Sequence, residues 1–132
     1  MAYKKTQEIN HDQYDDYALN RLRQSHTDEQ ILCMLNMFDK IKLRLTDNYR
    51  VHADLNLRIN INLIGAFSPY RMVIFKVDGD NLIYRRFDAG CAIDQDDQVC
   101  NINRVVDELD KVLPTVDQYN KMMRGLFSVM RQ

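Results

Sequence analysis

The chain has little cysteine, glycine and proline, and it has no tryptophan. Its cysteines, Cys33, Cys91 and Cys100, are odd in number and form no CxxC pair. This pattern argues against a disulfide framework and a zinc site. We therefore expect three reduced thiols, no metal, no cofactor and a cytoplasmic location. With four glycines, two prolines and no linker-like stretch, residues 1–132 predict a single domain.

The chain also lacks several motifs that would identify its chemistry. No apolar run approaches the ~20 residues of a membrane span, and no apolar stretch follows the N-terminal lysines as in a secretory signal. GxGxxG, GxxxxGK[ST] and HExxH are absent. The acidic loop 94–98 lacks the central glycine and terminal glutamate of an EF-hand calcium loop. These absences favour a non-enzymatic protein that binds no membrane.

The net charge of −1 conceals an uneven distribution. Residues 40–87 carry nine Lys and Arg against four Asp and Glu, whereas residues 88–117 carry two against eight. The two segments can face each other within the fold or across a dimer, or the basic segment can attract a charged partner. We favour pairing within the fold.

Apolar spacing predicts helices at both ends of the chain. A short helix is expected over 12–23, with Asn10 as its cap. Thr27 and Gln30 form a capping box for a second helix, whose apolar stripe follows helical spacing. A third helix is expected to start at Asp96 or Asp97 and to end before Pro114. The stripe of the second helix is Ile31, Met34, Leu35, Phe38, Ile41 and Leu45.

The middle of the chain predicts an antiparallel sheet. Apolar and polar residues alternate without interruption over 49–63, which indicates one long strand or a strand broken by a bend that keeps register. We expect a bend or bulge near Ala53 and Asp54, or an end that projects to meet a partner. Strands over 70–77 and 82–87 are joined by a hairpin at 78–81, and 91–93 can add a short fourth strand. The expected fold class is α+β, with two N-terminal helices, three to four strands and two C-terminal helices.

The polar positions of the long strand form the candidate binding surface. Asparagine is disfavoured in strands, so three asparagines at two-residue intervals depart from propensity. Such departures concentrate at functional surfaces, although a solvated face is equally consistent with the pattern. The candidate residues are Arg50, His52, Asn56, Arg58, Asn60 and Asn62.

Three functions are weighed. The first is a binding or regulatory protein that acts on a protein partner, such as a phage or mobile-element inhibitor of a host system. The second is a nucleic-acid-binding module that uses the basic segment 40–87. Most aromatic residues there occupy positions expected to face the core, namely Tyr49, Tyr70, Tyr84, Phe67 and Phe75, which argues against a stacking platform. The third and least favoured is an enzyme with a site near His52 and Cys91.

The order helix, three strands, helix is similar to that of the double-stranded-RNA-binding domain. That family needs a lysine-rich start to the helix after the strands, to hold phosphates across the groove. This chain has Asp94, Asp96 and Asp97 there, so the resemblance is one of order only and implies no phosphate binding. The chain also resembles secretion chaperones and immunity proteins in size and charge, without a shared motif.

The last helix is expected to follow a capping box at 115–118. Its seam could dock on the rest of the domain or pair with another chain. We expect self-association as a homodimer, through this helix or the end of the long strand. The candidate interface residues are Tyr119, Met123, Leu126, Phe127 and Met130.

Overall fold

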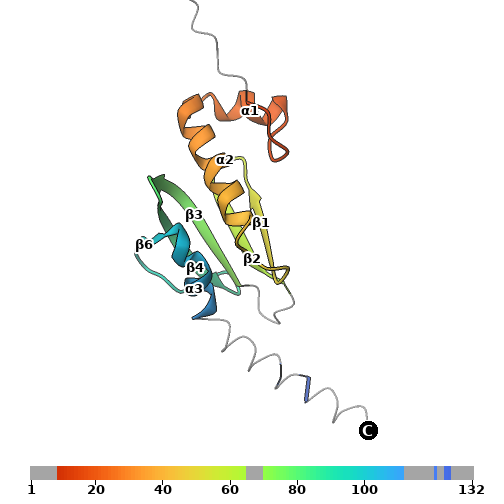
Figure 1. The fold of residues 1–132 in the computed structure, drawn as a ribbon, viewed down its shortest axis with the longest axis vertical. Helices are drawn as coiled ribbons and strands as arrows, with labels where there is room; N and C mark the ends of the chain where they lie inside the picture. The colour runs from red at the N-terminus through yellow and green to blue at the C-terminus, as the bar shows by residue number, and fades with distance from the viewer. Residues whose placement is uncertain (1–8, 65–69, 112–120, 122–123, 126–132) are drawn as a thin grey trace, which may run out of the picture.

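The computed structural model describes residues 9–64, 70–111, 121, 124 and 125. Within these residues the chain forms an α+β fold with one antiparallel sheet (Figure 1). The helices are α1 (Asp16–Leu22), α2 (Asp28–Lys42) and α3 (Val105–Asp110), the last preceded by the 3-10 turn Ile102–Arg104. The strands are β1 (Tyr49–Ala53), β2 (Ile59–Leu63), β3 (Tyr70–Asp78), β4 (Asn81–Asp88), β5 (Cys91–Ala92) and β6 (Gln98–Asn101).

The N-terminal helices follow the sequence pattern closely. The capping box of α2 is confirmed, because the Thr27 hydroxyl accepts from the Gln30 amide and the Gln30 side chain accepts from the Thr27 amide. The expected cap of α1 is wrong: the helix starts later, and Asp15 accepts from the amide of Ala18. An aspartate one residue before the helix supplies the cap that Asn10 was expected to supply.

The segment 49–63 is two strands rather than one. β1 and β2 pair antiparallel, with Tyr49 opposite Leu63 and Ala53 opposite Ile59. The connecting loop 54–58 has an odd number of residues, so the apolar positions keep their parity across the turn. The prediction of one long strand considered only a two-residue turn, which would reverse that parity. The break does occur where the bend was expected, directly after Ala53.

The centre of the sheet agrees with the sequence pattern, and its last strand does not. β3 and β4 form the expected hairpin, and β5 is the expected short strand. β6 replaces the first turns of the expected third helix and pairs with the first half of β4, with Cys100 opposite the buried Leu82. Among the residues that the structure describes, the sheet therefore has six strands rather than three to four. Asn101 then caps the 3-10 turn by accepting from the amide of Asn103.

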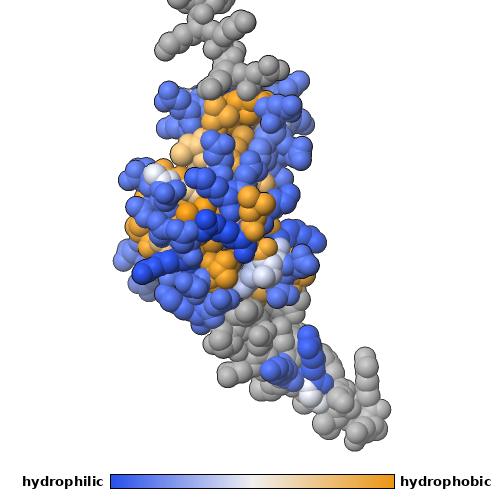
Figure 2. All heavy atoms as spheres, viewed as in Figure 1, coloured by the Kyte–Doolittle hydropathy of each residue, from blue (hydrophilic) through white to orange (hydrophobic). Residues whose placement is uncertain are grey.

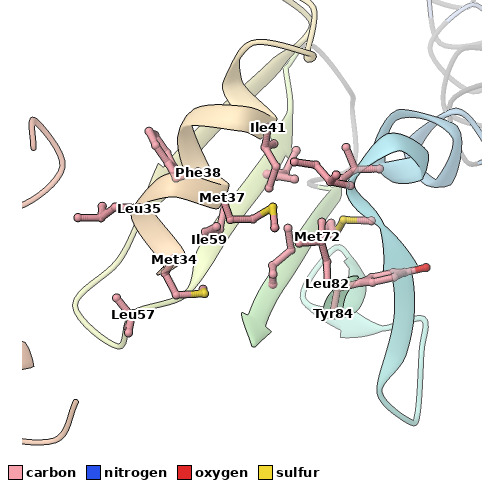
Figure 3. Packing of buried hydrophobic residues seen from close by; sticks show 14 of the residues in the cluster. Met34, Leu35, Met37, Phe38, Ile41, Leu57, Ile59, Met72, Leu82 and Tyr84 are labelled. Carbon is pink, nitrogen blue, oxygen red and sulfur yellow. The ribbon is translucent and has the colours of Figure 1, made fainter. Parts of the chain in front are cut away.

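One face of the sheet is covered by α2 and α3, which lie on the same side of it (Figure 1). Figure 3 shows Met34, Met37 and Ile41 of α2 close to the strand residues Ile59 and Met72. Every one of these side chains is buried. Each fully buried aliphatic side chain stabilises the fold by roughly 1.5–3 kcal/mol, so this layer fixes the orientation of the strands.

In the face of the molecule that Figure 2 shows, hydrophilic residues lie around its margins and hydrophobic residues gather toward the middle. Among the described residues, no helix is of a length and hydrophobicity that would let it span a membrane. Most of the expected last helix falls outside the described residues, as do the candidate interface residues Tyr119, Met123, Leu126, Phe127 and Met130.

Candidate functional site

The second face of the sheet is the candidate site, and none of the described helices covers it. Strand register places the side chains of this open face, because directly paired residues project to the same side. His52 lies opposite Asn60, Asn60 opposite Val73, and Val73 opposite Arg85. In the next row Arg50 lies opposite Asn62, Asn62 opposite Arg71, and Arg71 opposite Phe87. We call this surface the open face.

A shallow hollow of about 330 Å³ lies on the open face. Its lining combines apolar and charged side chains. Phe75 follows the alternation of Arg71 and Val73 onto this face, at the β-bulge that β3 makes between Ile74 and Lys76. The lining residues are Asp54, Arg58, Asn60, Arg71, Val73, Phe75, Arg85, Phe87 and Asp97.

Two arginines stack over the two phenylalanines of the hollow. The guanidinium carbon of Arg71 lies 5.1 Å from the ring centroid of Phe87, its direct neighbour across β3 and β4. The guanidinium carbon of Arg85 lies 6.0 Å from the ring centroid of Phe75. Both distances suit a cation–π interaction. The open face therefore carries two cation–π stacks that line the same hollow.

The two carboxylates of the hollow have different roles. Asp54 organises the loop 54–58: one oxygen accepts from the amides of Asn56 and Arg58, and the other accepts from the side-chain amide of Asn60 at 2.9 Å. Leu57 completes this loop with a positive φ of 59° and a buried side chain. Asp97 instead reaches the face from the loop after β5, where it lies 2.7 Å from Nε of Arg85.

The charge of the open face is positive. Four arginines, at positions 50, 58, 71 and 85, lie on it or at its rim beside two aspartates. Arg50, Arg58 and Arg71 make no ion pair with any residue that the structure describes. A cluster of cations without carboxylate partners creates a local potential that attracts anions, although the whole chain carries a charge of only −1.

The six residues of the predicted surface are only partly brought together. Arg50, His52, Asn60 and Asn62 share the open face, in two short rows rather than one long row. Asn56 and Arg58 lie in the loop 54–58. Asn60 is buried and bound to Asp54, so its departure from strand propensity has a structural cause.

The aromatic part of the site was missed by the sequence reasoning. Tyr70 and Tyr84 are buried as expected, but Phe75 lines the open hollow and Phe87, which was not weighed, lies beside it. Phe67 falls outside the described residues. The available signal was the alternation of β4, in which Arg85 and Phe87 share one parity while Leu82 and Tyr84 share the other.

The predicted pairing of basic and acidic segments is confirmed at β4. Arg86 donates from its backbone amide and its Nε to one oxygen of Asp94 and from its Nη2 to the other oxygen, each at 2.9 Å. These hydrogen bonds hold the pKa of Asp94 below its usual range and raise that of Arg86. Arg86 and Arg85 project to opposite faces of the sheet, so Asp94 and Asp97 are held on opposite faces too.

Titratable groups on the covered face are held in their inert forms. Burial raises the pKa of Tyr70 to about 12 and that of Cys100 to about 11. Burial and a hydrogen bond to Glu108 also raise the pKa of Tyr84. A phenol or thiol with a raised pKa stays protonated near neutral pH and is a poor nucleophile or base.

The two residues of the enzyme hypothesis lie apart. His52 is on β1 at one edge of the sheet, and Cys91 is on β5 at the other. Four strand spacings separate them, which is roughly 19 Å. One constellation cannot contain both residues.

Another histidine, His11, is fully engaged within the protein. Its Nδ1 accepts from the amide of Gln13, so Nε2 carries the hydrogen and donates to Asp39 at 2.8 Å. Its ring also meets Phe38 edge-on. His11 therefore ties the segment before α1 to α2. No group of three or more metal-ligating side chains is found within the described residues.

Comparison of the chain with family models, curated proteins and solved structures gives no match. A function must therefore be argued from the open face itself.

Proposed function

We propose that the chain is a non-enzymatic binding module whose open face binds single-stranded nucleic acid. The observation that carries the proposal is the pair of stacks, Arg71 over Phe87 and Arg85 over Phe75, in one hollow. Single strands are bound by aromatic and guanidinium planes that stack on bases, combined with cations that follow the phosphates. The open face offers both on an antiparallel sheet.

The arrangement favours a single strand over a duplex. Each ring lies under an arginine guanidinium in a shallow hollow, and the face of an unpaired base can stack on such a group. Arg50 and Arg58 lie beyond the stacks, where the backbone of a strand would pass. In a duplex the bases are stacked on one another and present only their edges.

A protein partner, which the sequence favoured first, becomes the second candidate. Protein interfaces are enriched in aromatic residues and arginine, so this composition suits a protein partner as well. What favours a polyanion is that three arginines of the open face have no carboxylate partner among the described residues. An acidic protein segment could still use the same arginines. It would not depend on the rings for base stacking, and this difference separates the two candidates in the experiment below.

The experiment is fluorescence anisotropy with labelled oligonucleotides of about 12 nucleotides, a length within the site sizes of proteins that bind single strands. Unstructured RNA, DNA of the same sequence and the corresponding duplex are compared over a range of salt. We expect the single strands to bind more tightly than the duplex. The logarithm of the affinity should fall with that of the salt concentration, with a slope of about −2 if three arginines contact phosphates.

Two matched pairs of variants test the contacts. Phe87→Leu should weaken binding by roughly 5- to 150-fold, the usual worth of one stacked base, while Phe87→Tyr should retain binding. Arg58→Ala should reduce the salt slope by about 0.7, whereas Arg104→Ala, in the 3-10 turn that leads into α3, should not. The proposal is wrong if no oligonucleotide binds at low salt, or if Phe87→Leu and Phe87→Tyr bind alike.

A further inference from the structure

The loop between β5 and β6 places a carboxylate, that of Asp97, at the proposed binding site. Asp94 anchors this loop through its three hydrogen bonds to Arg86, and its side chain is only 7% exposed. Three residues later, Asp97 places a carboxylate oxygen 2.7 Å from Nε of Arg85. Because Asp94 is fixed, Asp97 is held close to the open face.

Arg85 thereby has two partners at once. Its guanidinium stacks over Phe75, and its Nε edge is occupied by Asp97. A guanidinium binds carboxylates and phosphates through the same N–H groups, so a phosphate and Asp97 compete for that edge. The other arginines of the open face have no such carboxylate among the described residues.

We infer that Asp97 is an internal competitor that lowers the affinity of the open face for nucleic-acid phosphates. The inference rests on the proposed function. The side chains of Arg85 and Asp97 are 41% and 52% exposed. An exposed pair of this kind is weak, so a bound strand can displace Asp97 and take over Arg85. The loop between β5 and β6 thus lowers the affinity of the open face for phosphates without blocking access to it.

The test compares Asp97→Asn with Asp96→Asn in the full chain, by the anisotropy assay described above. Both variants remove one negative charge from the same loop, and the Asp96 carboxylate makes no ion pair within the described residues. Asp97→Asn should bind single-stranded RNA roughly two- to five-fold more tightly, the worth of an exposed ion pair. Its salt slope should match that of the wild type, because the bound strand contacts Arg85 in both proteins. Asp96→Asn should leave the affinity close to that of the wild type.

A double-mutant cycle completes the test. In an Arg85→Ala background, Asp97→Asn should give no gain beyond that of Asp96→Asn, because the residue for which Asp97 competes is gone. If the wild type binds and the two asparagine variants behave alike, the inference is wrong while the proposed function stands. If neither the wild type nor Asp97→Asn binds any oligonucleotide at low salt, the proposed function itself is wrong.

Discussion

Replacing Asp94 with alanine removes the acceptor of three hydrogen bonds from Arg86 and leaves a guanidinium, 18% exposed, without its counter-charge. Removing one partner of a buried ion pair costs about 3–5 kcal/mol. Arg86 retains some access to water, so we expect a loss of about 2–3 kcal/mol in the free energy of unfolding. For a chain of this size that loss corresponds to a fall in Tm of about 8–12 °C.

Urea unfolding followed by circular dichroism measures this loss. The control is Asp97→Ala, which breaks the neighbouring but exposed pair with Arg85 and should cost no more than about 1 kcal/mol. Adding Arg86→Met to Asp94→Ala should recover part of the loss, because the uncompensated charge is then removed too. The reasoning is refuted if the two aspartate variants are equally stable, or if the methionine brings no recovery.

Two further predictions concern stability. Because the hydrogen bonds of Arg86 hold the pKa of Asp94 below its ordinary value of about 3.9, the stabilisation by this pair is present above that value and is lost as the pH falls through the native pKa. Thermal melts between about pH 6 and pH 2 should therefore show a smaller acid-induced fall in Tm for Asp94→Asn than for the wild type; equal falls would contradict this. Thr27→Ala removes one half of the capping box of α2 and should cost about 1 kcal/mol in urea unfolding. Thr27→Ser keeps the hydroxyl and should cost less, and equal losses for the two variants would show that the cap does not stabilise the helix.

Local signals predicted most of the elements. The capping box of α2 and the turn between β3 and β4 depend on residues close in sequence, and both appear where the sequence placed them. The period-two pattern of 49–63 correctly placed the buried Tyr49, Ile59 and Ile61 on the covered face, but it did not predict that Asn60 is buried as well. It could not separate two strands from one, because an odd-numbered loop preserves the parity of the pattern.

The errors arose where a distant partner decides the local structure. Val99 and Ile102 have spacing that fits a helix, but the first half of β4 takes residues 98–101 as a paired strand instead. Each backbone group at the edge of β4 gains a hydrogen bond that way, and this requirement outweighs the weak local preference. Nothing in the segment itself indicates that an edge of β4 lies next to it.

The candidate site was only half predictable for a similar reason. Polar residues at alternate positions of a strand predict an exposed face, so Arg50 and Asn62 were correctly predicted to lie on it. An aromatic residue in a strand is predicted to be buried when its position relative to the two faces of the sheet is not known. Phe75 shares its parity in β3 with Arg71 and Val73, and Phe87 shares its parity in β4 with Arg85, but the apolar residues on both faces of β3 obscured this alternation.

The basic segment 40–87 can both pair within the fold and, as proposed, bind a partner, because its arginines lie on both faces of the sheet. Arg86 turns to the covered face, where Asp94 neutralises it in a buried pair. Its neighbour Arg85 turns to the open face, where the exposed Asp97 neutralises it only weakly. Burial decides the difference, since a buried charge must be paired and an exposed charge can exchange its partner. One acidic loop can therefore hold the fold together through its first aspartate and leave the second for an incoming phosphate to displace.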